Sequence, residues 1–305
     1  MKKKVLIVGA TGLIGKNLVQ KIINNDYDAI AATRNIDKAK EILRNKIEIV
    51  PFSENSEKFK DALIKSDAIV NLSGASIAGK LWSESYKKEI YESRIRSVET
   101  IYQVLSSISD FQNKKTFINA SAIGYYPNSD EVQDENFPPG ENFLAKVCVD
   151  WENAAKKIEA LGARTAILRI GMVLAKEGGA LSYMKLPFLF FLGGPLCSKK
   201  NYVSWIHIED LTNIFLRAID DENFRGVYNA SSPGFCSMEE FSRALGKSLN
   251  RPSWLYVPEK IIKIVLKDAA EAACSNQKIY PKRLLDNGFV FEFDNITKAL
   301  NHLFS

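Results

Sequence analysis

Histidine is almost absent from this sequence, and cysteine is scarce. Two histidines, His207 and His302, occur among the 305 residues, which argues against a metal centre built from several imidazole ligands. The four cysteines lie far apart without a C-x-x-C pair, at Cys148, Cys197, Cys236 and Cys274. This spacing predicts neither a zinc site nor a disulfide framework, and it suits a reducing cytosol. We therefore expect no metal site.

Long apolar runs are missing as well. The longest, LPFLFFLGGPLC (186–197), contains two prolines and two glycines and is too short to span a membrane as a helix. The basic start MKKKVLIVGATG has only a short apolar run that breaks at once into Gly and Thr, unlike a signal peptide. We expect a soluble, cytoplasmic chain with no membrane partner.

Basic residues form no stripe along the chain. Lys and Arg number 41 against 36 Asp and Glu, which gives a formal net charge of +5. Because the positive charges are dispersed, nucleic acid is not an expected partner. The length allows one large domain or two moderate ones, and the oligomeric state is left open.

Short apolar runs alternate with amphipathic segments of helical length over the first 230 residues. The runs cover residues 4–9, 29–33, 47–51, 68–72, 116–121, 163–170 and 226–231. The helical segments cover residues 15–25, 56–66, 86–108, 143–162 and 207–221. Unbroken apolar strands that alternate with helices predict a parallel sheet covered on both faces.

Two regions interrupt this alternation. Residues 172–204 are rich in Gly, Pro and aromatic side chains, and the tail from residue 232 contains a helical pattern with Ser237 as its N-cap. We therefore predict an α/β protein with a Rossmann-type doubly wound sheet and a smaller C-terminal substrate lobe. The dinucleotide-binding domain covers 1–171, with 205–231 returning to it. The lobe is made of 172–204 and 232–305.

A glycine-rich turn follows the first run. In VLIVGATGLIG, Gly9 permits a tight turn, Gly12 lets the backbone approach a pyrophosphate, and Gly15 lets the helix pack close to the strand. Free N–H groups at the start of the helix would face the anion. Glycines that merely form a turn are the alternative. The predicted cofactor contacts of this loop are Gly9, Thr11, Gly12, Leu13, Ile14 and Gly15.

The end of the second run indicates which dinucleotide binds. An acidic residue there would bind a ribose 2′-hydroxyl and favour NAD, but the sequence reads AATRN, with Arg34 in that place. A guanidinium can form two bonds to a 2′-phosphate, so we predict NADP. The alternatives are that Arg34 stacks on adenine or is solvated. After the fourth run, the small residues of NLSGAS predict further cofactor contacts at Leu72, Ser73 and Gly74, unless they reflect tight packing alone.

These features together resemble the short-chain dehydrogenase/reductase superfamily in its extended, epimerase/dehydratase-like form. The segments GATGLIG, INASAIGYY and SWIHIED carry the resemblance. The ordered series NLSGASIAGKLW, SRIRSVETI, FLAKVCVDWE, GGALSYMKLPF and YPKRLLDNGFVFEFDNITKAL is similar to an uncharacterised branch labelled epimerase family protein, or nucleoside-diphosphate-sugar epimerase. The resemblance covers essentially the whole chain.

The resemblance implies a serine, here Ser121, that steadies a substrate hydroxyl or carbonyl, and Tyr125 four residues later near the substrate. It also implies a Tyr-x-x-x-Lys pair on the following helix, in which the lysine holds the nicotinamide ribose and lowers the pKa of the tyrosine. The chain departs from this pattern, because Phe143 precedes Val147, and Leu144 precedes Cys148.

Three accounts of the chemistry stay open. Ser121 with Tyr125 or Tyr126 could supply an alternative acid, although Tyr125 could equally shape the pocket wall. The proton could instead come from water or substrate. The chain could also bind NADP(H) without catalysis, as a sensor or scaffold. The leading hypothesis is an oxidoreductase or epimerase-like protein acting on a small carbonyl or sugar-like substrate between the lobes.

Several other charged residues have more than one interpretation. Arg94 and Arg96 are two apart and cannot share a helix face, so one could point to the cofactor while the other is solvated. Arg169 ends a buried run and needs a partner, either a structural carboxylate or an anionic ligand. His207 and Asp210 are more typical of a helix cap that ties the lobes together than of a catalytic base.

Overall fold

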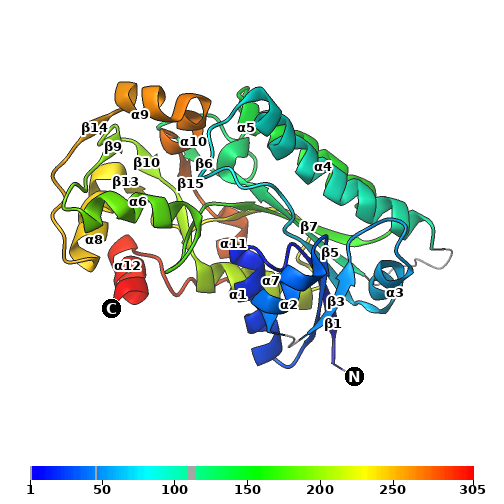
Figure 1. Cartoon of the computed structure of the whole chain (residues 1–305). Helices are drawn as coiled ribbons and strands as arrows, with labels where there is room; N and C mark the ends of the chain where they lie inside the picture. Colours follow the sequence, from blue (N-terminus) through cyan, green and yellow to red (C-terminus); the bar gives the residue numbers. More distant parts are fainter. Residues whose placement is uncertain (1, 45–46, 109–114) are drawn as a thin grey trace.

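The computed structural model describes residues 2–44, 47–108 and 115–305 and is built around one seven-stranded sheet (Figure 1). The strand order is β12-β7-β5-β4-β1-β2-β3, and every pairing is parallel. The order reverses between β1 and β4, which is where doubly wound folds bind ligands. The strands are β1 (Lys4–Val8), β2 (Asp28–Thr33), β3 (Glu48–Pro51), β4 (Ala68–Asn71), β5 (Thr116–Ala122), β7 (Arg164–Ile170) and β12 (Gly226–Ala230).

Helices cover both faces of this sheet. In Figure 1, α4 and α5 run together along one face, and α1 and α7 pack against each other on the other. The helices around the sheet are α1 (Leu13–Asn24), α2 (Ile36–Leu43), α3 (Glu57–Lys65), α4 (Glu84–Ser106), α5 (Phe143–Glu159), α7 (Ile208–Asp220) and α11 (Lys282–Asp286). The prediction of a doubly wound Rossmann-type α/β fold is therefore confirmed, and α2 is a helix that the alternation did not reveal.

Short polar side chains begin most of these helices. Asn35, Ser56, Ser83 and Asn142 each accept a hydrogen bond from a backbone N–H of the first turn, which satisfies a donor that the helix itself leaves unpaired. Ser237 forms a complete capping box with Glu240, so its predicted place at a helix start is confirmed.

A second hydrophobic core lies beside the sheet and joins two distant stretches of chain. Leu181, Phe188 and Trp205 from the first stretch pack with Phe241 and Leu300 from the second. The elements of this lobe and its junction are β6 (Val132–Gln133), β8 (Met172–Leu174), α6 (Gly179–Leu189), β9 (Leu196–Cys197), β10 (Tyr202–Val203), β11 (Trp205–His207), β13 (Cys236–Ser237), α8 (Met238–Ser248), β14 (Val257–Pro258), α9 (Glu259–Leu266), α10 (Ala270–Ala273), β15 (Lys278–Ile279) and α12 (Ile296–Phe304). The tail also returns to the sheet, because Leu284 packs in the main hydrophobic core, which the strands of the sheet form with the helices on its faces.

The cysteine spacing gave a wrong prediction in this lobe. Cys197 and Cys274 form a disulfide across 77 residues of sequence, with their Cα atoms 5.4 Å apart. The sequence separation hid this pair, since the fold brings β9 beside the end of α10. Cys148 and Cys236 are free and buried.

Loss of this disulfide is expected to destabilise the protein. We predict that Cys274→Ser lowers the free energy of unfolding by about 2–4 kcal/mol, because the cross-link restricts the unfolded chain. Denaturant unfolding with and without a thiol reductant measures this effect, and the reductant should leave the variant unchanged. Equal stability of the variant and the oxidised wild type would contradict the prediction.

Within the three described ranges, no helix is both long and apolar enough to cross a membrane.

Candidate nucleotide-binding and catalytic site

The glycine loop forms a tight cradle between β1 and α1. Gly9 has a φ of +86°, in the left-handed region that favours glycine. A Cβ on Gly15 would lie 2.3 Å from the carbonyl oxygen of Gly9, so only glycine lets α1 approach the loop this closely. Gly12 precedes α1, where no side chain caps the helix and no acidic residue occupies the first turn. The first-turn N–H groups are thus free for an anion such as a pyrophosphate.

The loop after β4 lies against this cradle. A Cβ on Gly9 would come within 2.9 Å of the carbonyl carbon of Leu72 and 3.1 Å of the Ser73 nitrogen. Beneath them, buried Asn71 donates to Asn119 on β5 and to Ser97 on α4, at 2.8 and 3.1 Å. The predicted cofactor residues of both loops therefore meet at the switch point, where a dinucleotide would pass close to backbone. Their contacts with a cofactor stay a prediction.

Arg34 lies just beyond the end of β2. Its side chain is exposed and forms no ion pair with any described residue. The neighbouring Asn35 caps α2 by accepting from the Lys38 N–H at 3.0 Å. The guanidinium is therefore available to an anionic ligand at this edge, and the structure leaves both the 2′-phosphate and the solvated interpretation open.

Ser121 is held in a buried ion-pair network at the end of β5. Its hydroxyl donates to the Glu152 carboxylate at 2.8 Å. Arg169 on β7 binds both oxygens of the same carboxylate, from Nε at 2.8 Å and Nη2 at 2.9 Å. Burial would lower the pKa of Arg169, but Glu152 and the hydroxyl of Tyr126 raise it above its ordinary value. Of the two interpretations of Arg169, the structure shows the structural ion pair.

Glu152 was not predicted from the sequence, although the need of Arg169 for a partner was a signal for it. This carboxylate decides what Ser121 can offer to a ligand. Because the serine proton is committed to Glu152, its oxygen can accept a hydrogen bond but has no second proton to give.

The two tyrosines after β5 have different surroundings. Tyr126 is fully buried, donates to Asn229 at 2.7 Å and accepts from Arg169 at 2.8 Å. Burial raises the pKa of Tyr126 to about 12, although Arg169 acts in the opposite direction. Tyr125 is partly exposed, and its ring lies 3.3 Å from the Arg169 guanidinium carbon. No described residue hydrogen-bonds the Tyr125 hydroxyl, so Tyr125 is the tyrosine that can reach a ligand.

The helix positions of the missing Tyr-x-x-x-Lys pair hold apolar side chains. Phe143 packs edge-on against Trp82, with ring centroids 5.7 Å apart, and Val147 is buried. Lys146 is exposed, and burial raises the pKa of the neighbouring Cys148 thiol to about 11. These positions of α5 therefore offer no replacement for the tyrosine and its lysine, because the side chain of Lys146 faces solvent and the thiol of Cys148 is buried.

The two arginines of α4 separate as their spacing predicts. Arg96 is exposed and pairs with Glu92 at 3.0 Å. Arg94 points inward, where its Nη1 donates to the carbonyl oxygens of Ala75 and Ile90 at 3.2 and 2.8 Å. Burial lowers the pKa of Arg94.

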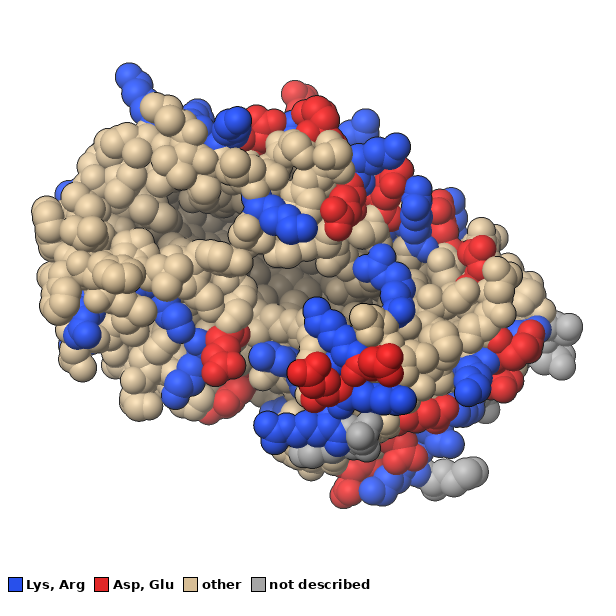
Figure 2. Space-filling view, viewed as in Figure 1, with Lys and Arg blue, Asp and Glu red and all other residues tan. Residues whose placement is uncertain are grey.

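A hollow lies between the two halves of the molecule (Figure 2). In this view the small-lobe side of the hollow is almost free of charged side chains, and Lys and Arg side chains border the opposite side. The carboxyl ends of the strands face the small lobe (Figure 1), so a ligand at the switch point would reach this hollow.

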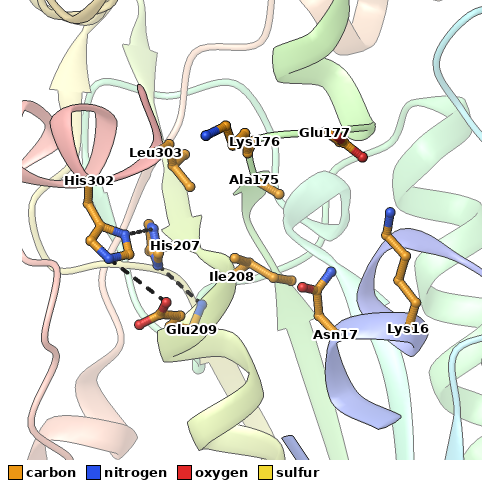
Figure 3. Close-up of a pocket in the computed structure, with 10 residues that line it drawn as sticks. All are labelled: Lys16, Asn17, Ala175, Lys176, Glu177, His207, Ile208, Glu209, His302 and Leu303. Atoms are coloured by element: carbon orange, nitrogen blue, oxygen red, sulfur yellow. Dashed lines mark hydrogen bonds and ion pairs between the residues drawn. The ribbon is translucent and has the colours of Figure 1, made fainter. Parts of the chain in front are cut away.

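A separate pocket of about 330 Å³ lies where the two cores join (Figure 3). Its walls come from α1, the loop after β8, the start of α7 and the end of α12, and none of the predicted site residues lines it. His207 and His302 meet there, with Nε2 and Nδ1 3.3 Å apart, and His207 stacks on Phe293 at 3.8 Å. The Asp210 carboxylate accepts hydrogen bonds from the backbone N–H groups of Glu292 and Phe293, both at 2.9 Å. These contacts show that His207 and Asp210 join the lobes.

The His207 contact gives the stability a pH dependence. Burial and the neighbouring His302 lower the pKa of His207 to about 4. The unfolded chain binds this proton below about pH 6.5, whereas the folded chain does so only near pH 4, so stability falls as the pH drops through this window, by at most about 3 kcal/mol. Burial raises the pKa of Asp210, which opposes the loss at acid pH, and the carboxylates of Glu209 and Glu292 lie nearby.

One variant separates the contribution of His207 to this pH dependence from that of Asp210. We predict that His207→Gln flattens the decline in unfolding free energy between pH 6.5 and 4.5, measured by urea denaturation at several pH values. Asp210 is unchanged in this variant, so wild type and variant differ in the histidine alone. The same slope for both proteins would contradict the prediction.

The cradle, the switch point and the free helix start define a dinucleotide-binding α/β protein of the Rossmann class. A family model described as the NAD dependent epimerase/dehydratase family matches residues 5–231, and one described as a domain of unknown function matches 257–303. The chain belongs to the NAD dependent epimerase/dehydratase family, which confirms the resemblance drawn from the motifs.

Relatives that match nearly the whole chain support the same family. The Arabidopsis thaliana "Epimerase family protein SDR39U1 homolog, chloroplastic" is 38% identical over 97% of this chain and 85% of its own length. "Epimerase family protein SSP1921" of Staphylococcus saprophyticus is 36% identical over 99% of both chains. The crystal structure of the human epimerase family protein SDR39U1 (isoform2) with NADPH is similar with a TM-score of 0.83 and 26% identity, covering 98% of both chains.

Proposed function

We propose that this protein binds NADP(H) and acts as an oxidoreductase or epimerase-like enzyme on a small carbonyl or sugar-like substrate. The observation that carries this proposal is the cradle at the N-terminus of α1, together with the exposed Arg34 after the neighbouring strand β2, which forms no ion pair with the described residues. Gly9, Gly12 and Gly15 would admit the pyrophosphate, and Arg34 would bind a 2′-phosphate. Leu72, Ser73 and Gly74 would line the cofactor on the other side. The human relative's structure with NADPH supports this choice of dinucleotide.

The chain's own residues would set up the substrate end. NADP(H) supplies hydride transfer when bound. Ser121, with its proton fixed on Glu152, would accept a hydrogen bond from a substrate hydroxyl, and Tyr125 would donate from the partly exposed face of the cluster. The hollow between the lobes would hold the substrate. We propose the cytoplasm as the location of the protein.

A second candidate is a protein that binds NADP(H) without catalysis. Buried Val147 and the packed ring of Phe143 favour it, since the usual proton-transfer pair is absent from α5. The loss of a positioned acid typically slows a reaction by 10²–10⁴-fold, so slow turnover and no turnover both fit this site.

Titration of the purified protein with NADPH and NADH tests the first step, followed by cofactor fluorescence and melting temperature. We expect NADPH to bind more tightly. Absence of binding by either cofactor would refute both candidates.

A panel of small carbonyl compounds and nucleotide sugars tests the second step, with NADPH absorbance and product analysis as readouts. Turnover that falls in Tyr125→Phe supports the enzyme. Binding without any turnover across the panel supports the sensor.

A further inference from the structure

Arg94 is a half-buried cation at the edge of the proposed nucleotide site, and the described chain provides it with no carboxylate. No acidic side chain in residues 2–44, 47–108 and 115–305 forms an ion pair with it, whereas Arg96 two residues later pairs with Glu92. Its guanidinium lies 5.2 Å from the ring centroid of Trp151 on α5. Burial lowers the pKa of Arg94, and the groups that oppose this are Cys148 and Tyr86, not a carboxylate. The side chain is half-buried rather than enclosed, and none of its nitrogen atoms is among the fully buried ones that lack a partner, so an acceptor from outside the chain can reach it.

The hydrogen bonds of Arg94 leave half of its guanidinium unused. The two bonds to Ala75 and Ile90 both start from Nη1. A guanidinium has five N–H donors, so the three on Nε and Nη2 have no acceptor among the described residues. These donors have the fixed planar geometry that suits paired oxygen atoms of a ligand.

The position of Arg94 in the sheet order indicates which ligand atoms it meets. The guanidinium carbon packs on Gly74, where a Cβ would approach it to 3.1 Å. Gly74 follows β4, while Arg34 follows β2, and β1 with its glycine loop lies between those strands. A dinucleotide crosses this edge at the switch point. With its adenosine half toward Arg34 and its pyrophosphate at α1, the other half extends toward β4 and Arg94.

We propose that Arg94 binds the nicotinamide half of the cofactor, donating from Nε and Nη2 to oxygen atoms of its ribose. This inference rests on the proposed NADP(H) function. It places a cation of α4 next to α5, the helix that carries Val147 and Cys148 where the usual pair would stand.

The test compares the whole cofactor with its adenine half. NADPH and adenosine 2′,5′-bisphosphate are titrated by calorimetry into wild type and Arg94→Met, which keeps the length of the side chain but removes its donors. Because Arg94→Met loses charge-assisted hydrogen bonds, we expect its affinity for NADPH to fall by roughly 10- to 100-fold. The bisphosphate has no nicotinamide ribose, so its affinity should change by less than about twofold. Arg94→Lys, which keeps the charge, should lose less NADPH affinity than Arg94→Met, and it serves as the variant if Arg94→Met does not fold.

Ser93→Ala is the matched control, because Ser93 also supports the loop after β4. Its hydroxyl oxygen accepts the Ala75 N–H at 2.9 Å, so this variant loosens the loop without removing a charge. It should leave NADPH affinity within about twofold of wild type, on the basis that one neutral hydrogen bond contributes little.

Three results would overturn the inference. One is unchanged NADPH affinity in Arg94→Met. A second is equal weakening of NADPH and bisphosphate binding in Arg94→Met. A third is an equal loss of NADPH affinity in Ser93→Ala. Either of these two results would show that Arg94 only supports the loop after β4. If wild type binds neither NADPH nor the bisphosphate, the proposed function itself fails, and that result is distinct from the other three.

Discussion

An Arg34→Asp variant is expected to bind NADPH roughly 100-fold more weakly than wild type, while its NADH affinity changes by less than about threefold. The exposed guanidinium at the end of β2 forms no ion pair with the described chain, so the substitution breaks no ion pair among the described residues. It exchanges an attractive charge for a repulsive one at the position that distinguishes a 2′-phosphate from a 2′-hydroxyl.

Competition between the two cofactors provides the measurement, and Arg34→Lys is the control that keeps the charge but loses the paired geometry. The control should lie between wild type and Arg34→Asp. An equal loss of affinity for NADPH and NADH in Arg34→Asp would show that Arg34 supports the adenosine half without binding the 2′-phosphate. A wild type that prefers NADH would refute the assignment of NADP.

An Arg169→Met variant is expected to lose about 3–5 kcal/mol of unfolding free energy. Arg169 and Glu152 each retain only 4% of their side-chain exposure, so removal of the guanidinium leaves a buried carboxylate without its cation. The same change removes the donor to Tyr126 and the cation beneath the Tyr125 ring. Denaturant unfolding at neutral pH measures the loss.

The double variant Arg169→Met with Glu152→Leu identifies the cause. Removal of both charges abolishes the unpaired carboxylate, so the double variant should be more stable than Arg169→Met alone. Additive losses would show that the two residues act independently, contrary to the paired geometry. Cofactor titration of the folded variants would show whether this network also orders the nucleotide site.

The sheet could be predicted because its physical signal is local. Seven apolar runs became the seven strands of the sheet, and the glycine spacing identified the turn where α1 begins. α2 was missed because only two of its eight residues, Ala39 and Leu43, are buried. The hydrophobic periodicity of this short segment is too weak to indicate a helix between two strands.

The site was predictable only in part, because its decisive contacts join distant residues. The missing Tyr-x-x-x-Lys pair could be read from α5, but the bond from Ser121 to Glu152 spans 31 residues and depends on how α5 packs on β5. The disulfide illustrates the same limit, since spacing alone cannot show that Cys197 and Cys274 meet. Arg94 could be identified as one of two candidates, whereas its unused donors required the packing of α4 against the loop after β4.

Trp205 and Ile206 are neighbours in the chain and yet belong to different hydrophobic cores. This division has a consequence for folding during synthesis. Most strands of the sheet emerge from the ribosome before the small lobe, and they pair with partners already made. Leu181 and Phe188 on α6, in contrast, share their core with Phe241 and Leu300, which are translated much later. We expect α6 to stay incompletely packed until α8 and α12 have been translated, so its apolar side chains are exposed in the nascent chain.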